Sequence, residues 1–486
     1  MKSVVIIGGG LGGLTSGALL AKQGYRVTLL EQHNIIGGSA TRFKRRGGFN
    51  VEVGLHEMDD PFAEGSKKEI FTALGVYDNI EFVQPKELFH VKTANYDFTM
   101  PDGFTEAYSA LVATFPDETE GIKAYFELIT AIALEYEKLV NMKWWQKLLF
   151  PFIFKSIFKY RQTSLQEVLD TLFKDEELKL ILCTNIQYYH DRPSDFSFLY
   201  HSIAQYAYYN GGGWFIKGGS QELSNYLASI ITEYNGTIIK KANVVKVLQK
   251  KGSAIGVVYE KKGTSISLEA DIIISNASPM QTYEMASLPY TQDKTVGISL
   301  YTLYLGFSQN IKTVYGEKAY SQFNYSKFDS LDTYTSSLQR PMLERGHVFV
   351  DYSQIDAALT DKDKSLGVIC GVDYLKDWEV LSDEAYKAKK EQLTITLIAE
   401  LEATHPGISK LVEYAELATA KTMQRYLKTP EGTAYGFAPT AKQFFREPEV
   451  KSNKLENLYF VGAWVIGGGF TPAIMSGAMA SREITK

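Results

Sequence analysis

The stretch SVVIIGGGLGGLTSGALLAKQGYRVTLLE, residues 3–31, decides the fold of this chain. Its apolar run at residues 4–7 is typical of a buried parallel strand, and glycines follow at once. Residues 14–23 have the pattern of a helix, and residues 26–30 form a second apolar run that ends at Glu31. This order predicts a strand, a glycine-rich turn, a helix and a second strand, which together open a doubly wound α/β domain.

The glycines of this turn have the G-x-G-x-x-G spacing, with Gly8, Gly10 and Gly13 at its fixed positions. The first permits a tight turn, the second lets the backbone approach a pyrophosphate, and the third allows close packing of helix and strand. We therefore expect Gly8, Gly10, Leu11 and Gly13 to hold a dinucleotide at the helix N-terminus. Glu31 follows Gly13 by 18 residues, where an acid binds a ribose hydroxyl. A plain glycine turn beside a surface glutamate is the alternative.

Composition narrows the class of protein. The chain has 486 residues, 45% of them hydrophobic and 22% charged, as in ordinary globular proteins, and its length allows two domains or one large discontinuous fold. A net charge of −5 gives no indication of a nucleic-acid partner. Cys183 and Cys370 are far apart and lack metal-binding spacing, so we predict no metal site and a cytoplasmic location. The apolar run before the first glycines is too short for a signal peptide, and no apolar run reaches the roughly 20 residues of a transmembrane helix, so we expect neither.

Two more glycine-rich segments indicate the cofactor. Residues 37–54, GGSATRFKRRGGFNVEVG, resemble the second glycine signature of the FAD-dependent amine oxidase and phytoene desaturase superfamily. Residues 460–481, FVGAWVIGGGFTPAIMSGAMAS, resemble its last flavin motif. The resemblance implies FAD as the cofactor. The positions that it places at the pyrophosphate or flavin are Gly37, Gly38, Ser39, Arg42, Gly54, Gly462, Ala463, Gly469 and Thr471.

Two of these positions leave alternatives open. Arg42 either faces the pyrophosphate or is a solvated loop charge. Ala463 stands where many flavoproteins carry an Asp that binds the ribityl chain, so that contact must come from backbone or from elsewhere.

The middle of the chain resembles the same superfamily. Residues 211–231 and 270–283 are similar to segments of carotenoid desaturases, although Ile216 replaces the usual proline, and the resemblance implies that Val245 lies beside the adenine. The branch of retinol saturases and carotenoid isomerases is the closest, because its characteristic segments are similar to residues 53–58, 188–215 and 429–437.

Apolar strands and amphipathic helices alternate along the rest of the chain. Strands are expected at residues 237–240, 243–249, 254–260, 271–279, 297–307, 347–352, 365–372 and 457–463, and helices at residues 66–74, 117–140, 162–180, 220–233, 383–404 and 472–484. The predicted fold class is α/β, with a discontinuous Rossmann-type FAD-binding domain and an inserted α+β substrate domain. We assign residues 1–75, 215–290 and 440–486 to the first and residues 76–214 and 291–439 to the second.

The resemblance implies an FAD-dependent oxidoreductase. Its reaction would desaturate, saturate or isomerise double bonds of a hydrophobic polyene or isoprenoid lipid through hydride transfer at flavin N5. Saturation also needs a proton donor, for which His56 and Glu57 are the first candidates and Tyr435 the second. A turn histidine bonded to backbone is the alternative for His56. Electrons would come from a transient donor, or leave to a quinone or to oxygen.

Two other functions fit the same fold. A flavin amine oxidase would act on a polar amine. A non-catalytic prenyl-lipid escort of the GDP-dissociation-inhibitor kind would have a degraded phosphate loop, whereas the loop here is complete.

The most unusual segment is NMKWWQKLLFPFIFKSIFKYR, residues 141–161, which has five basic and no acidic residues. Pro151 is expected to split it into two short helices. Tryptophans beside lysines that reach toward phosphates are typical of a helix lying in a membrane surface. We therefore predict a membrane-docking segment in the substrate domain and a peripheral location on the cytoplasmic membrane. A buried helical pair with lysine tips in water is the alternative.

Overall fold

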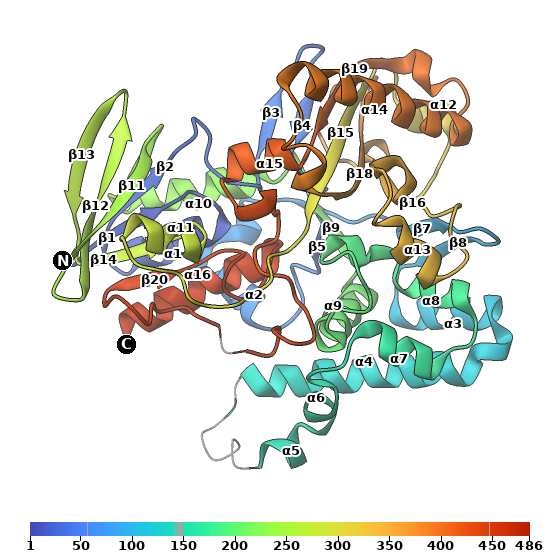
Figure 1. Cartoon of the computed structure of the whole chain (residues 1–486), viewed down its shortest axis with the longest axis horizontal. Helices are drawn as coiled ribbons and strands as arrows, with labels where there is room; N and C mark the ends of the chain where they lie inside the picture. The colour runs from blue at the N-terminus through green and yellow to red at the C-terminus, as the bar shows by residue number, and fades with distance from the viewer. Residues whose placement is uncertain (56, 141, 143–148, 447) are drawn as a thin grey trace.

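A five-stranded parallel sheet forms around the opening residues of the chain (Figure 1). The computed structural model describes all residues except 56, 141, 143–148 and 447. The strand order is β10 (Thr237–Lys240), β2 (Arg26–Glu31), β1 (Ser3–Ile7), β14 (Ile272–Ser275) and β20 (Leu458–Phe460), and every neighbouring pair is parallel. Strands from both ends and from the middle of the chain thus meet in one sheet, and the predicted Rossmann-like fold is confirmed.

Alternate residues of β1 face the two sides of this sheet. Val4 and Ile6 pack against helices α1 (Leu11–Lys22), α10 (Gln221–Glu233) and α16 (Phe470–Thr485). Val5 and Ile7 pack on the opposite side, in a core shared with β11, β12, β13 and α11. Those elements span Asn243–Lys250, Ser253–Lys261, Thr264–Glu269 and Pro279–Met285. The sheet is therefore covered on both faces, as parallel sheets require.

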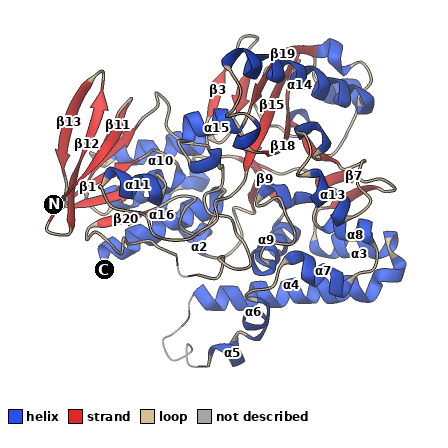
Figure 2. Cartoon of the chain, in the orientation of Figure 1, coloured by secondary structure: helices blue, strands red, loops and turns tan. Residues whose placement is uncertain are grey.

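A seven-stranded mixed sheet forms the second part of the molecule (Figure 2). Its order is β19 (Val412–Ala418), β15 (Ser299–Phe307), β18 (Ser365–Asp373), β17 (His347–Asp351), β16 (Ser321–Asn324), β7 (Glu87–Lys92) and β8 (Asp97–Pro101). Only β16 and β7 run parallel to each other. This sheet combines two stretches of chain that are about 200 residues apart and joins them edge to edge.

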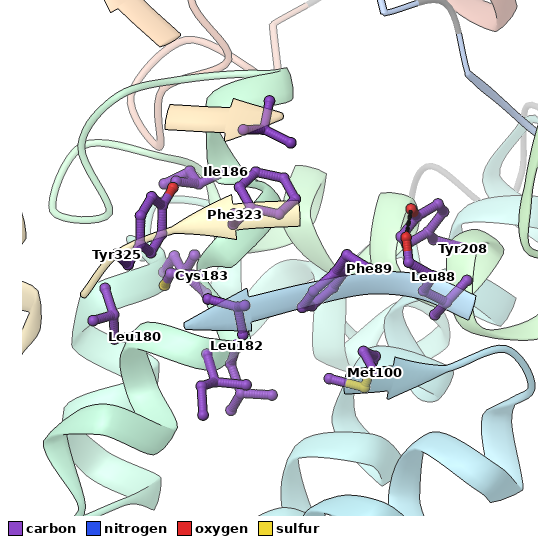
Figure 3. Close-up of a cluster of buried hydrophobic side chains, with 14 of the residues drawn as sticks. Leu88, Phe89, Met100, Leu180, Leu182, Cys183, Ile186, Tyr208, Phe323 and Tyr325 are labelled. Atoms are coloured by element: carbon purple, nitrogen blue, oxygen red, sulfur yellow. Dashed lines mark hydrogen bonds between the residues drawn. The ribbon is translucent and has the colours of Figure 1, made fainter. Parts of the chain in front are cut away.

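Helices cover both faces of this second sheet as well. Tyr304 and Val348 share a core with a helical layer on one face, whereas Leu303 and Ile369 face α14 (Asp383–Thr404) on the other. The helical layer consists of α3 (Phe104–Thr114), α4 (Thr119–Val140), α7 (Leu165–Leu172), α8 (Glu176–Leu182) and α9 (Phe198–Gly211). Figure 3 shows part of this core, where Phe89 of β7 and Phe323 of β16 lie near Leu182 and Ile186.

Short elements complete the chain. They are β3 (Arg42–Lys44), β4 (Asn50–Glu52), β5 (Met58–Asp59), β6 (Phe82–Val83), β9 (Gly213–Ile216), α2 (Ser66–Leu74), α5 (Phe150–Ile153), α6 (Lys155–Tyr160), α12 (Ile311–Tyr315), α13 (Leu331–Ser337) and α15 (Ala420–Leu427). Among the described residues, none of the helices combines the length and apolarity needed to cross a membrane.

Two helix boundaries differ from the predictions. Pro151 lies within the first turn of α5, where proline is tolerated, and the break before α6 falls instead at Phe154. Phe154 is fully buried, so packing of its ring sets the break. The helix predicted at residues 162–180 is two helices, α7 and α8, because Asp175 caps a new helix through Leu178 N–H.

The packing of α1 on α16 makes a testable prediction. A Cβ atom added to Gly477 would lie 2.6 Å from the carbonyl oxygen of Gly12 and 3.0 Å from the backbone nitrogen of Ser16. Gly477→Ala should therefore push the helices apart and lower the unfolding free energy by about 1–3 kcal/mol, measured by thermal denaturation. Arg482→Ala, on the exposed side of the same helix, is the control and should change stability little. Equal stabilities of the two variants would contradict this account.

Candidate functional site

The carboxyl ends of the parallel strands converge at one edge of the sheet. Gly8 follows β1, Glu31 ends β2, and Asn276 follows β14, while Gly462 lies two residues beyond β20. The chain leaves β1 toward β2 on one side and β14 lies on the other, so a crevice opens between them. Ligands of open α/β sheets bind at such a crevice.

Glycines let the backbone segments at this edge approach closely. Gly8 has φ +92°, a conformation that favours glycine, and its N–H donates to the carbonyl of Leu30 at 2.8 Å. A Cβ atom on Gly10 would lie 2.5 Å from Nδ2 of Asn276, and one on Gly12 would overlap the backbone nitrogen of Gly462. Residues without a side chain are therefore required where these backbone segments meet, at Gly10 and Gly12.

The N-terminus of α1 lies at this edge without a side-chain cap. Gly10 is its N-cap residue, Leu11 is its first residue, and Gly13 packs a bare backbone against the carbonyl of Gly8. The first N–H groups of a helix have no partner within the helix, and they carry a partial positive charge. They form a binding site for an anion such as a pyrophosphate.

Glu31 is buried at the end of β2, with 5% of its surface exposed. Its Oε2 accepts the N–H of Gly9 at 2.8 Å, and its Oε1 accepts the N–H of His33 at 2.8 Å. These bonds fix the carboxylate beside the glycine turn. Each oxygen has a second lone pair, so capacity remains for a ribose hydroxyl.

The second glycine signature lies beside the first. Gly37 donates its N–H to the carbonyl of Gly9 at 2.7 Å, and Gly38 and Ser39 are exposed. Arg42 forms an ion pair with Glu222 at 2.6 Å. Its guanidinium thus has a protein partner on α10.

Three tyrosines of the seven-stranded sheet region bind the backbone that follows this signature. The hydroxyl of Tyr304 donates to the carbonyl of Val53 at 2.7 Å, that of Tyr352 to Gly54 at 3.0 Å, and that of Tyr320 to Leu55 at 3.4 Å. We call these residues the tyrosine clamp. The clamp fixes the segment that connects the two sheets.

The C-terminal motif returns to the crevice from the opposite side. The N–H of Gly462 donates to the Ser476 hydroxyl at 2.7 Å, and Ala463 is half-buried. Gly469 is the N-cap of α16, and Thr471 in the first turn donates its hydroxyl to Asp59 at 2.5 Å. Val245, by contrast, has 39% of its surface exposed, at a bulge in β11.

Two adjoining cavities lie between this motif and the second sheet. Cavity 1, about 10 Å³, is lined by Tyr188, Tyr189, Tyr200, Tyr435, Phe437, Pro439, Gly467 and Gly468. Cavity 2, about 10 Å³, is lined by Leu55, Gln187, Tyr188, Leu300, Val348, Cys370 and Tyr435. Tyr188 and Tyr435 belong to both walls. The linings of both cavities are chiefly aromatic and aliphatic.

Glu57 lies directly before β5, against Gly213 of β9. Both of its carboxylate oxygens are buried, and neither has a hydrogen-bond partner among the described residues. Burial raises the pKa of Glu57 to about 8, and the neighbouring Tyr208 phenol opposes this shift only in part. Figure 3 shows that Tyr208 donates to the carbonyl of Leu88, at 2.9 Å. The carboxyl therefore holds a proton at neutral pH.

The structure describes only one of the other two catalytic candidates. His56 lies outside the described residues. Tyr435 is half-buried and lines both cavities, and burial raises the pKa of its phenol far above the usual value of about 10. Tyr435 therefore remains protonated and can donate a hydrogen bond.

Several site residues were not predicted from the sequence. Asn276 faces the glycine turn with a buried Oδ1 that has no partner among the described residues, and Tyr188 and Gln187 line cavity 2. The quoted segments at 188–215 and 270–283 contain Tyr188 and Asn276, but nothing in their spacing marks these two residues. Taken together, the uncapped helix, the bare glycines and the free capacity of Glu31 and Asn276 fit a dinucleotide.

Comparisons with known proteins agree with this geometry. Residues 6–71 match the model of an NAD(P)-binding Rossmann-like domain. All-trans-retinol 13,14-reductase of Danio rerio is 25% identical, over 99% of this chain and 85% of its own. Prolycopene isomerase of Daucus carota and 4,4'-diaponeurosporene oxygenase of Staphylococcus aureus are each 24% identical over 99% of this chain, and over 79% and 98% of their own lengths. These full-length matches confirm the predicted resemblance to the superfamily.

Solved structures share the fold across almost the whole chain. Putrescine oxidase with bound putrescine has a TM-score of 0.64 at 15% identity, covering 100% of this chain and 99% of its own. A Rab GDI from Plasmodium falciparum has a TM-score of 0.52 at 13% identity, covering 99% and 97%. At such identities the likeness shows the fold alone.

The pKa of Glu57 makes a second prediction. Its folded value of about 8 exceeds the ordinary 4.5, so the folded protein keeps a proton that the unfolded chain releases. Stability should therefore fall as the pH rises from about 5 to about 8, by up to about 4 kcal/mol. Glu57→Gln removes this dependence. Thermal denaturation should therefore show that the stability of the variant, relative to that of the wild type, increases as the pH rises. Glu64→Gln, at an exposed position, is the control. A difference that stays constant with pH would contradict the assignment.

Proposed function

We propose that the protein is an FAD-dependent oxidoreductase acting on carbon–carbon double bonds of a hydrophobic polyene or isoprenoid lipid. One observation carries this proposal: cavity 1 places an aromatic, apolar wall against Gly467 and Gly468 of the C-terminal glycine motif. This apolar wall thus lies beside the motif that the resemblance assigns to a flavin. The relatives named as a retinol reductase and a prolycopene isomerase support the substrate class.

The residues proposed to hold FAD follow the edge of the parallel sheet. Gly8, Gly10, Leu11 and Gly13 would hold the pyrophosphate at the start of α1, and Glu31 the ribose. Further contacts are assigned to Gly37, Gly38, Ser39, Arg42, Gly54, Val245, Gly462, Ala463, Gly469 and Thr471. Bound flavin supplies hydride transfer to or from an allylic or alkene carbon.

The proposed proton donor is the carboxyl of Glu57, with His56 beside it in sequence and Tyr435 as a second donor. A pKa of about 8 keeps Glu57 protonated at neutral pH, and its oxygens have no competing partner among the described residues. Tyr435 lies in the wall of both cavities and can orient a bound chain.

We propose that the parallel sheet and its cover form the FAD-binding domain, residues 1–75, 215–290 and 440–486. Residues 76–214 and 291–439 then form the substrate domain. A quinone or oxygen is proposed as the electron acceptor for reactions that oxidise the substrate.

We further propose that residues 141–161 dock the protein on the cytoplasmic membrane. In the described part, Phe152 of α5 has 73% of its surface exposed, Leu149 47% and Phe158 of α6 37%. Lys155 and Lys159 are exposed between them. Buried Phe154 and Ile157 anchor the pair, and the Glu135 carboxylate accepts the Ile157 N–H at 2.9 Å. An apolar surface with cations at its border matches an anionic bilayer.

Aromatic contacts connect this surface to the cavity. The ring of Phe150 in α5 lies 6.1 Å from that of Phe445, and the ring of neighbouring Phe444 lies 5.2 Å from that of Tyr200. Tyr200 lines cavity 1. Packed aromatic side chains thus connect this surface to the wall of cavity 1.

Anaerobic photoreduction tests the proposed reaction. The reduced holoprotein should be reoxidised by a conjugated polyene, seen as recovery of flavin absorbance near about 450 nm. Glu57→Gln should slow this step about 10²- to 10⁴-fold, because the reduced polyene carbon takes its proton from Glu57. Reoxidation by oxygen should keep its rate, because the proton that completes hydrogen peroxide comes from water. Glu64→Gln should behave as the wild type. Reduction of the oxidised protein by amines, with no response to any polyene, would overturn the proposal.

Flotation with anionic vesicles tests the docking surface. Phe152→Ser combined with Lys155→Gln should weaken binding more than about tenfold, since an exposed aromatic that would enter the bilayer and a surface cation are both lost. Val380→Ser, at a position with 82% of its surface exposed outside this segment, is the control. Unchanged vesicle binding by the double variant would mean that this surface does not meet the membrane.

A further inference from the structure

We infer that Asp59 and Lys67 are positioning residues, an ion pair that acts through Thr471 on the flavin proposed to bind at the start of α16 and sets its reduction potential. The Nζ atom of Lys67 lies 2.6 Å from Oδ2 of Asp59, and it also donates to the Asp59 carbonyl at 2.8 Å. The pair joins β5, which ends at Asp59, to α2 and, through Thr471, to α16. The inference rests on the proposed function and adds residues that control its cofactor.

The direction of the Thr471 hydroxyl is fixed by the Asp59 carboxylate. Thr471 lies in the first turn of α16, and its Oγ1 donates to Oδ1 of Asp59 at 2.5 Å. An ionised carboxylate can only accept and a hydroxyl has a single hydrogen, so that hydrogen is committed to Asp59. Thr471 therefore offers only lone pairs to a further partner. An N–H group of the flavin ring is the partner that this orientation allows.

Lys67 occupies a position where a lysine is otherwise disfavoured. Its side chain has 6% of its surface exposed, and it lies in the first turn of α2. The start of a helix carries a partial positive charge that repels a cation, and burial removes water from the ammonium group. The ion pair with Asp59 offsets both effects. An apolar residue would serve folding at least as well, so we relate the pair to the site.

The Asp59 carboxylate also lies close to the wall of cavity 1. Burial is the main cause that raises the pKa of the phenols of Tyr189 and Tyr200, and the negative charge of Asp59 adds to both shifts. Both tyrosines line cavity 1. Asp59 thus contacts the start of α16 through Thr471 and lies near the apolar wall beside the C-terminal glycine motif.

The balance of the two charges affects the reduction of a bound flavin. Reduction by two electrons and one proton leaves an added negative charge on the flavin ring. A nearby cation stabilises that charge, and a nearby anion destabilises it. Loss of the Lys67 ammonium would leave an unbalanced carboxylate and lower the reduction potential. Loss of the Asp59 charge would leave an unbalanced ammonium and raise the potential.

Equilibrium redox titration of the holoprotein against a reference dye tests this inference. Lys67→Met should lower the equilibrium constant for flavin reduction about tenfold, and Asp59→Asn should raise it about tenfold, each a shift of about 30 mV for a two-electron couple. The double variant, and Lys67→Arg, which keeps the charge, should stay within about threefold of the wild type. Lys68→Met and Glu64→Gln make matched changes in an exposed ion pair and should leave the potential unchanged.

The outcomes separate this inference from the proposed function. A single variant with the potential of the wild type, or shifts of both single variants in the same direction, would overturn the inference, while reoxidation by a polyene would still support the proposed function. A protein that binds no flavin would overturn both. Flavin content and thermal denaturation identify a misfolded single variant. The double variant, which leaves no unpaired charge, then decides, and a tenfold shift of its equilibrium constant would overturn the balance of charges.

Discussion

The close approach of bare backbone between the two ends of the chain is the constraint on which the structure depends. Gly12 in α1 faces the backbone of Gly462, and Gly477 in α16 faces the carbonyl of Gly12. A side chain at any of these positions would separate β20 and α16 from β1 and α1. The crevice between β1 and β14 would then lose one wall, and with it the arrangement that fits a dinucleotide.

The tyrosine clamp connects this crevice to the second sheet. Tyr304, Tyr320 and Tyr352 hold three consecutive carbonyls directly before the segment that carries Glu57. Their hydroxyls satisfy backbone groups that would otherwise be buried without partners. Other tyrosines of the same region line the cavities. The tyrosines of this region thus serve both to join the two sheets and to line the apolar cavities between them.

Most strands and the long helices could be predicted from the sequence, because each is marked by a local pattern of apolar residues. The strands near 237–260 and the helix at 383–404 lie close to where this pattern places them. The predictions were wrong where packing decides, as at Phe154, whose buried ring breaks the helical segment after α5. Site residues such as Asn276 and Gln187 could not be predicted, because a single polar residue carries no periodic signal.

The sequence by itself determined the glycine turn and its acid, because a tight turn and a close backbone approach demand glycine at fixed spacing. Only the tertiary structure decided the protonation state of Glu57. Its pKa of about 8 arises from burial among side chains that are far away in sequence. The same holds for the cavities, whose walls bring Leu55, Tyr188, Val348 and Tyr435 together. Such properties depend on which distant residues exclude water from a group, and local sequence does not record that.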